Sequence, residues 1–451
     1  MEPHWFFTAP YDAPMVRRGD PLGLRLAAGR YAEVLAPGLS NRTIDARWLT
    51  LTAWMLVMAN DVWRRRGNAA PAGLSRSAAR EIFEWMEPLE LLWVARTLSL
   101  AKPKGRQLPG QRAVRRWLDA DQHPARFGLS PGQYRRTRFI GVYGGYRAAL
   151  RGLQGMTVDG DGWRPGPVAE ALARVAQEAL GAAAAAPAKP HGKFTAEHYW
   201  QKEGWEAWQS RAGKDFLPES LQHIRPVTAG EIRILRPVLF GDRESTDGSR
   251  LRHRVVEVMD ASKAGAHYAL CHELERKLGR DTHGALDRLG SFARLADAGL
   301  DVMNAIWTQL GAAEVRKVPA LRPREFAEHE DARERSREFV KAAKAWQREK
   351  SAFRPEWALA HELAALAIEH QRDPGRLIGA LVEFHEKNGG GRRWFRVDEE
   401  GLVRPASILR DQEGSPYRYR LFSVARLAMQ CKVIDRLPKA LEPEDDEEGQ
   451  E

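Results

Sequence analysis

The segment HYALCHELER (His267–Arg276) holds the side chains best suited to bind a metal or to activate a nucleophile. On a helix, His267 and Cys271 lie four residues apart on one face. Zinc requires three or four ligands that converge on one point, whereas the adjacent His272 would lie about 100° further around the helix. We therefore interpret Cys271 as a buried side chain with solvated histidines near it.

Other patterns typical of catalytic sites are incomplete. HELAALAIEH (His361–His370) begins like the zinc-protease motif H-E-x-x-H, but Ala365 occupies the position of the second histidine. Neither a G-x-x-x-x-G-K-[ST] phosphate loop nor a G-x-G-x-x-G dinucleotide loop occurs. A divergent metal-dependent nuclease stays open as an alternative, with Glu273 or Asp398 as its acid. We expect no catalytic residue, metal or cofactor.

The segment EKNGGGRRWFRVDEEG (Glu386–Gly401) has the composition of a nucleic-acid contact. Three glycines precede a group of basic and aromatic residues, which could bind in a nucleic-acid groove or stack on an unstacked base. The candidate residues are Arg392, Arg393, Trp394 and Arg396. In the alternative interpretation, Trp394 and Phe395 alternate on a strand, one of them packs inward, and the arginines are merely exposed.

The segment from Ser130 to Pro167 is a second candidate for nucleic-acid contact. Ser130 and Pro131 can begin a helix, Gly141–Gly145 would break it, and Tyr146–Leu153 would form a second one. MTVDGDGWRP then predicts a hairpin turning at Asp159–Gly162, and Pro167 opens a further helix. The order resembles the winged helix-turn-helix superfamily in layout. The resemblance implies phosphate contacts from the two helices and the wing, namely Arg135, Arg136, Arg138, Arg147, Arg151, Trp163 and Arg164.

An internal similarity suggests a second such unit. VDGDGWRP (Val158–Pro165) and VDEEGLVRP (Val397–Pro405) share Val-Asp-x-x-Gly followed by Arg-Pro. A predicted helix pair striped by leucines, joined by the turn RDPG, precedes the second copy. Two unrelated hairpins with similar turn chemistry are the alternative.

The elements that would position these residues are mainly helical. In LAPGLSNRTIDARWLTLTAWML (Leu35–Leu56), Pro-Gly predicts a turn, and Ser40, Asn41 or Thr43 could cap a helix that is apolar nearly all round. A single glycine does not make a phosphate loop, so we expect a helix entrance. Arg42 and Arg47 flank it, and we expect them to pair with Asp45 or a neighbouring loop carboxylate.

Charge favours a polyanionic partner. The net charge is +10 although Glu442–Glu451 holds seven acids and no base, and 55 of the 70 basic residues are arginine. Arginine binds phosphate bidentately, which suits nucleic acid. Arginine and alanine richness from GC-rich coding DNA is the alternative explanation. The acidic tail would either fold back on a basic groove or simply solvate the terminus.

The predicted fold is mainly α: a multidomain helical protein with one or two winged-helix-like units carrying small β-hairpins. The Ala-Pro tract Gly181–Lys193 predicts a linker, and EFAEHEDARERSREFVKAAKAWQREKSAF a solvated, charge-laced helix. With two distant cysteines, no signal-peptide pattern and no apolar run of about 20 residues, we expect a cytoplasmic protein with no membrane partner. The predicted divisions are an N-terminal helical domain 1–105, a winged-helix-like domain 106–180, the linker 181–193, a helical domain 194–350, a second winged-helix-like unit 351–438, and an acidic disordered tail 439–451.

Two short segments carry a family resemblance. PGLSNRTIDARWLTLTAWM, and DAGLDVMNAIWTQL (Asp297–Leu310), resemble segments of an uncharacterised bacterial protein family encoded near helicases and nucleases in phage-defence gene clusters. The resemblance implies an accessory subunit of an antiviral defence system and supplies no catalytic residue.

Together these features predict a non-enzymatic nucleic-acid-binding or scaffold subunit of a multisubunit complex. It would contact the phosphates of double-stranded DNA through its arginine-rich surfaces, beside partner proteins of the same system. The alternative from another class is a protein-interaction scaffold that does not bind DNA.

Overall fold

The structure is a computed structural model that describes residues 20–65, 142–180, 227–241, 247–315, 320–349, 354–389, 393–406 and 417–442, with scattered residues between 78 and 111. Its described elements are helices and one two-stranded sheet, so the prediction of a mainly α protein is confirmed. The chain divides into two compact units. Unit 1 comprises Met1–Val34 with Ser262–Tyr419, and unit 2 comprises Leu35–Ala261 with Arg420–Glu451.

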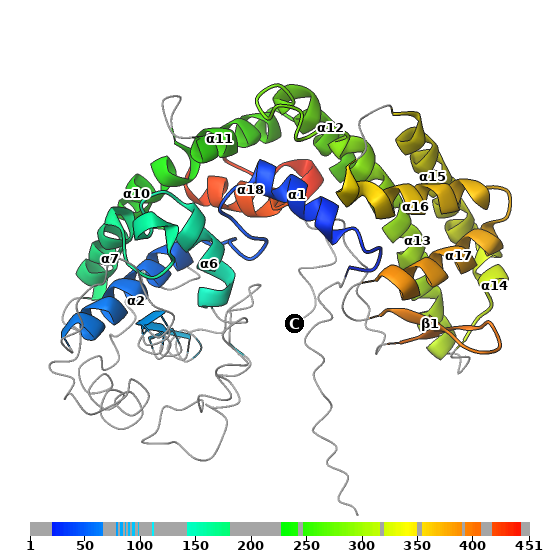
Figure 1. Cartoon of the computed structure of the whole chain (residues 1–451), viewed down its shortest axis with the longest axis horizontal. Coiled ribbons are helices and arrows are strands. Elements are labelled where there is room, and N and C mark those ends of the chain that lie inside the picture. Colours follow the sequence, from blue (N-terminus) through cyan, green and yellow to red (C-terminus); the bar gives the residue numbers. More distant parts are fainter. Residues whose placement is uncertain are drawn as a thin grey trace, which may run out of the picture. The chain divides into compact units, whose positions relative to one another are not determined.

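Unit 1 is built around the long helix α13, which packs on α12 and α15 (Figure 1). Its described elements are α1 (Arg25–Leu35), α12 (His267–Leu278), α13 (Leu289–Val315), α14 (Pro323–Ala327), α15 (Glu330–Arg348), the 3₁₀ turn η6 (Pro355–Trp357), α16 (Ala358–Glu369), α17 (Pro374–Asn388), β1 (Phe395–Val397) and β2 (Val403–Pro405). Large aromatic side chains fill the core, including Phe292, Phe339, Trp346 and Trp357. Burying such side chains supplies the main driving force for folding.

The helix pair and hairpin predicted near the end of unit 1 are confirmed. The Asp373 side chain accepts a hydrogen bond from the Arg376 amide and caps α17, with Pro374 at its first position. β1 and β2 pair antiparallel with Phe395 opposite Pro405, and Leu321 adds an isolated bridge to Val403.

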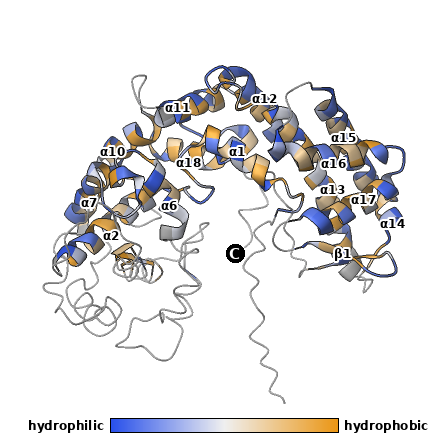
Figure 2. Ribbon diagram, viewed as in Figure 1, coloured by the Kyte–Doolittle hydropathy of each residue, from blue (hydrophilic) through white to orange (hydrophobic). Residues whose placement is uncertain are grey.

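Helix α15 has the predicted charge-laced surface. Residues on its solvent side form ion pairs three or four positions apart, such as Arg333 with Glu330 at 2.6 Å and the partly exposed Arg335 with Asp331 at 2.8 Å. The other side of the helix, with Phe339 and Trp346, is buried. In Figure 2 the helices of each unit likewise carry both hydrophobic and hydrophilic residues.

Unit 2 contains the helix predicted to be buried nearly all round, α2 (Ala46–Arg65), which packs on α7 and α6. The other described elements of unit 2 are α6 (Val142–Gly152), the 3₁₀ turn η1 (Val158–Gly160), α7 (Pro167–Leu180), α10 (Ala229–Phe240), α11 (Asp247–Asp260), α18 (Leu421–Gln430) and the 3₁₀ turn η7 (Lys439–Leu441). On α2, Leu49, Trp54, Met55 and Leu56 are at most 1% exposed, which confirms that prediction.

The entrance of α2 differs in detail from the expectation. Asp45, immediately before the helix, accepts a hydrogen bond from the Arg47 amide at 3.1 Å and serves as its cap. Ser40 and Thr43 instead contact each other, and the Ser40 hydroxyl donates to the Gly145 carbonyl oxygen at 2.8 Å. These side chains hold the entrance against α6 instead of capping α2.

The predicted helix break at Gly141–Gly145 is wrong within the described residues, since α6 runs continuously from Val142 to Gly152. Glycine serves close packing here. A Cβ on Gly145 would lie 3.3 Å from the Arg42 side chain, and one on Gly152 would lie 2.3 Å from the Gly38 Cα. The absence of side chains lets the 35–45 segment approach the α6 backbone.

The hairpin predicted at Asp159–Gly162 is reduced to a tight loop. One bridge joins Thr157 to Pro165, and the Val158 amide donates to the Arg164 carbonyl at 2.9 Å, but no ladder continues. The 3₁₀ turn η1 occupies the tip, where Asp159 has φ of 53°. Helix α7 then begins at Pro167 as predicted.

The predicted domain divisions and the winged-helix layout stay predictions. Residues 130–141 and 181–226 lie outside the described residues. At the other end, η7 lies inside the range predicted as an acidic tail, and Leu441 is 6% exposed. The tail prediction therefore begins too early, and 443–451 are outside the described residues.

Candidate functional sites

Helix α6 carries Arg147 and Arg151, two of the arginines predicted to contact phosphate. Its buried side carries Tyr146, Ala149 and Leu150, while Arg147 and Arg151 are exposed. Because residues four apart share a helix face, the two guanidinium groups project from the same side. The Arg42 side chain, from the segment before α2, lies against Gly145 of α6. Gly145 lies on the buried side of α6, away from this pair, so we call Arg147 and Arg151 alone the α6 arginines.

The loop after α6, which holds Trp163 and Arg164, is less accessible to a phosphate than predicted. The Arg164 guanidinium contacts Asp161 at 2.5 Å and Asp159 at 3.0 Å. The hydrogen bond with Asp161 raises the pKa of Arg164, and a phosphate would have to displace two carboxylates. Trp163 is half-buried, with its ring edge-on to Phe83. Arg135, Arg136, Arg138 and Arg392 lie outside the described residues.

The hairpin candidate also requires a correction. Trp394 is only 6% exposed, its ring centroid lies 5.6 Å from that of Trp307, and Phe395 is fully buried. Both aromatic rings therefore pack inward, and neither offers a face to a base in this structure. Arg393 and Arg396 are exposed, while Arg404 pairs with Asp398 at 2.5 Å.

The two units differ in charge balance. Among the described residues of unit 1, acidic and basic side chains are nearly equal in number, whereas basic ones outnumber acidic ones in unit 2. The excess of basic side chains among the described residues therefore lies in unit 2.

The HYALCHELER segment forms a buried polar cluster of His267, Cys271, Asp297 and Tyr419. The His267 Nδ1 lies 3.1 Å from Asp297 Oδ2, and the Cys271 sulfur lies 3.8 Å from the other ring nitrogen. Tyr419 stacks on the imidazole with centroids 5.4 Å apart. The expectation of a solvated histidine at position 267 is wrong, because it is 8% exposed. The spacing of residues 267 and 271 indicated their pairing, but nothing local indicated Asp297.

The order of Asp, His and Cys in this cluster is that of a nucleophilic triad. The cysteine, however, is 0% exposed, so no substrate reaches its sulfur in this structure. Burial also raises the pKa of the Cys271 thiol, which opposes formation of the thiolate. We therefore interpret the cluster as a buried charge network.

The charge of His267 predicts an alkaline loss of stability. Burial opposes the charged form, but the Asp297 carboxylate, 3.1 Å from Nδ1, favours it, and the pKa of His267 is raised well above its usual value. Its contribution to stability is full below the unfolded pKa, about 6.5, and is lost as pH rises through the folded pKa. We expect Asp297→Asn to shift that loss to lower pH, measured as the urea midpoint against pH. Superimposable profiles of wild type and variant would contradict the assignment.

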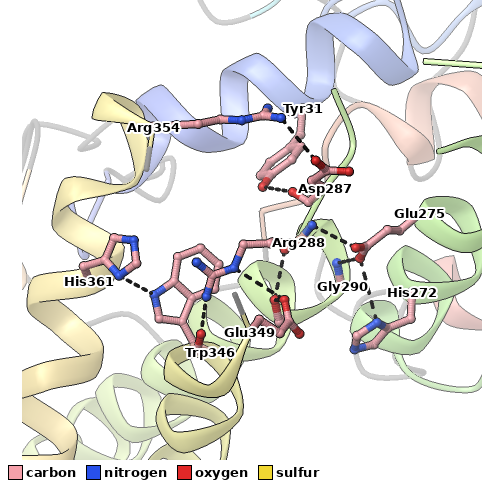
Figure 3. Close-up of polar contacts among 11 residues, drawn as sticks. Tyr31, His272, Glu275, Asp287, Arg288, Gly290, Trp346, Glu349, Arg354 and His361 are labelled. Atoms are coloured by element: carbon pink, nitrogen blue, oxygen red, sulfur yellow. Dashed lines mark hydrogen bonds and ion pairs between the residues drawn. The ribbon is translucent and has the colours of Figure 1, made fainter. Parts of the chain in front are cut away.

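A second polar cluster joins the ends of α12, α13 and α15 in unit 1, with α1 and α16 at its edge (Figure 3). Arg288, with φ of 63°, places its guanidinium 3.5 Å from the Trp346 ring centroid and donates to the Trp346 carbonyl near the end of α15. Glu275 accepts hydrogen bonds from the Arg288 and Gly290 amides, at 2.8 and 2.9 Å, and so caps α13. Each charged group here satisfies the end of a helix.

The edge of this cluster is held by tyrosine and histidine. The Tyr31 hydroxyl donates to the Asp287 carbonyl at 2.8 Å, and the Trp346 indole donates to His361 Nδ1 at 3.2 Å (Figure 3). Burial, together with the positive charge of Arg288, lowers the pKa of His361. In the sequence, His361 stands out only as part of an incomplete zinc motif, and no local pattern indicates Arg288 or Trp346.

Glu273 and Asp398, the acids considered for a nuclease, have different surroundings. Glu273 lines a shallow hollow of about 440 Å³ with His272, Glu275 and Arg276, all from α12. Asp398 is occupied by Arg404 and by the Glu400 and Leu402 amides of the hairpin turn. In the part of the chain that the structure describes, no three His, Cys, Asp or Glu side chains converge as metal ligands.

Three further observations bear on function. Comparison with protein-family models, curated proteins and solved structures found no match. None of the described helices has both the length and the apolar character needed to cross a bilayer. The sequence GLSPG at 128–132 fits the pattern G-x-S-x-G of a nucleophile elbow, but it lies outside the described residues, so the expectation of no catalytic residue is untested there.

Proposed function

We propose that this chain is a non-enzymatic nucleic-acid-binding subunit that contacts phosphates through unit 2. The observation that carries the proposal is the pair Arg147 and Arg151, four residues apart and exposed on one side of α6. Arginine side chains in this arrangement can bind successive phosphates, and such contacts carry no base information. Double-stranded DNA is the expected ligand. Arg393 and Arg396 on unit 1 are a second, smaller basic site.

Binding should therefore weaken for every sequence alike when the α6 arginines are removed. In Arg147→Ala/Arg151→Ala, we expect the negative slope of log affinity against log salt to become shallower by roughly 1.8, because each of the two lost duplex phosphate contacts contributes about −0.9. Fluorescence anisotropy with a labelled duplex of about 30 base pairs and the matching single strand, across a salt series, measures this slope.

The matched control removes the same charge from unit 1. Arg333 and Arg337 are exposed on α15, and both pair with Glu330. We expect Arg333→Ala/Arg337→Ala to keep the wild-type slope. Equal slopes for wild type and the α6 variant would count against that surface.

A protein-interaction scaffold is the second candidate. The described residues of unit 1 have little excess charge, which suits a protein contact better than a phosphate contact. If wild type ignores both DNA forms at physiological salt, this candidate replaces the first. In either role, the resemblance of the 37–55 and 297–310 segments supports a place beside the helicases and nucleases of a phage-defence system.

A further inference from the structure

His385 on α17 connects three segments of unit 1 through its two ring nitrogens. Nδ1 lies 2.7 Å from the Pro21 carbonyl oxygen, and Nε2 accepts a hydrogen bond from the Trp394 amide at 2.9 Å. A carbonyl can only accept and an amide N–H can only donate, so the proton must be on Nδ1 and Nε2 must be bare. The geometry requires a neutral imidazole in a single tautomer.

The ring has no room to turn away from these partners. His385 is 0% exposed, and the Phe395 ring lies edge-on to it at 5.8 Å. On another side, its ring atoms are 2.9 and 3.1 Å from the point where a Cβ on Gly389 would stand. Only glycine fits at 389, and the imidazole is enclosed by the hairpin and the end of α17.

The charged groups around His385 are few. Glu386 beside it on α17 favours the imidazolium, and Arg393 at the start of the hairpin opposes it. Near Pro21, the Asp20 carboxylate is occupied by the Tyr417 hydroxyl at 2.5 Å and the Arg25 amide at 2.9 Å.

The other helices packed on α17 place their described charges elsewhere. On α16, Glu362 pairs with Lys387 at 2.9 Å, and on α14, Arg324 lies against Gly375 at the far end of α17. The acidic residues Glu330, Asp331 and Glu338 of α15 pair with basic residues of the same helix. None of these pairs offers His385 a direct carboxylate partner.

We propose that His385 is a pH-dependent switch that holds the β1–β2 hairpin on α17 when neutral and releases its first residues when protonated. A proton on Nε2 would face the Trp394 N–H, so the hydrogen bond that fixes Trp394 becomes a repulsive contact of two donors. Release exposes Trp394 and Phe395, which lie between Arg393 and Arg396. The switch goes beyond the proposed function and does not depend on it.

We expect the hairpin to be released at acidic pH. Burial lowers the pKa of His385, so the neutral form persists at neutral pH. The stabilisation is present above the unfolded pKa of about 6.5 and is lost as pH falls through the folded pKa.

Amide hydrogen exchange of 393–406 in the full chain, measured by mass spectrometry at about pH 7.5 and about pH 5, tests the proposal. His385→Gln offers an amide oxygen to the Trp394 N–H but does not titrate. Comparing proteins at the same pH cancels the intrinsic pH dependence of exchange. Relative to His385→Gln, we expect wild-type exchange in this segment to rise roughly tenfold on acidification, the effect of losing one buried hydrogen bond.

The matched control is His329→Gln, which changes an exposed histidine of the same unit that makes no side-chain capping bond. It should follow wild type at both pH values. An unchanged wild-type ratio, or the same acid response in His385→Gln, overturns the proposal. Should His385→Gln not fold, nitrogen NMR of the wild-type histidines decides: protonation of His385 Nε2 must coincide with loss of the Trp394 amide signal, and independent titrations overturn it.

Discussion

Arg47→Ala is expected to destabilise unit 2 by about 3–5 kcal/mol, because it leaves a carboxylate charged and buried. Arg47 Nε and Nη2 lie 2.8 and 2.9 Å from the two oxygens of Glu231, and both side chains are 0% exposed. Glu231 also accepts a hydrogen bond from the Thr228 amide at 2.8 Å, as part of the capping box of α10. The loss therefore affects the packing of α2 and the start of α10 together.

Urea unfolding measures the change in the free energy of unfolding, and hydrogen exchange of α2 and α10 assigns it to unit 2. Arg47→Met/Glu231→Leu removes both charges and should recover most of the lost stability, apart from the capping bonds, because no buried charge remains. Arg333→Ala, which breaks the exposed pair with Glu330, is the matched control and should leave the midpoint unchanged. A change below about 1 kcal/mol in Arg47→Ala would show that Glu231 is hydrated in solution.

Trp346→Ala is expected to destabilise unit 1 by about 3–5 kcal/mol, the usual effect of emptying a large aromatic site in a core. The indole is 0% exposed and lies 5.7 Å from the Trp357 ring and 6.1 Å from the Phe292 ring. Its loss also removes the surface on which the Arg288 guanidinium lies, 3.5 Å away. A cavity and a less well-packed buried cation add to the lost burial.

Trp346→Phe separates the contributions. It keeps most of the ring contacts but loses the hydrogen bond to His361, so we expect a cost of about 1 kcal/mol from that bond plus a smaller packing loss. Tyr268→Ala, at a ring that is 36% exposed, controls for removal of an aromatic side chain outside the core. Urea unfolding with exchange of α13 and α15 measures all three variants. If Trp346→Ala and Tyr268→Ala cost the same, the core assignment fails.

The sequence by itself determined the features that depend on neighbouring residues. Apolar periodicity predicted α2, and leucine stripes on either side of the turn RDPG predicted the helix pair α16 and α17, because helix faces follow from spacings of three or four. The hairpin around residues 398–401 followed from turn chemistry. Gly145 suggested a helix break that the structure lacks, because its actual role is to let the distant Arg42 side chain approach α6.

The tertiary structure decided which side chains meet and which remain available. Arg47 has its partner 184 residues away, and Asp297 lies 30 residues from His267. Trp394 could be an exposed stacking residue or a core residue on an identical local pattern, and only packing against Trp307 selects the core. Periodicity assigns a residue to one side of an element, but it carries no information on what covers that side. That information exists only once segments far apart in the chain have packed together.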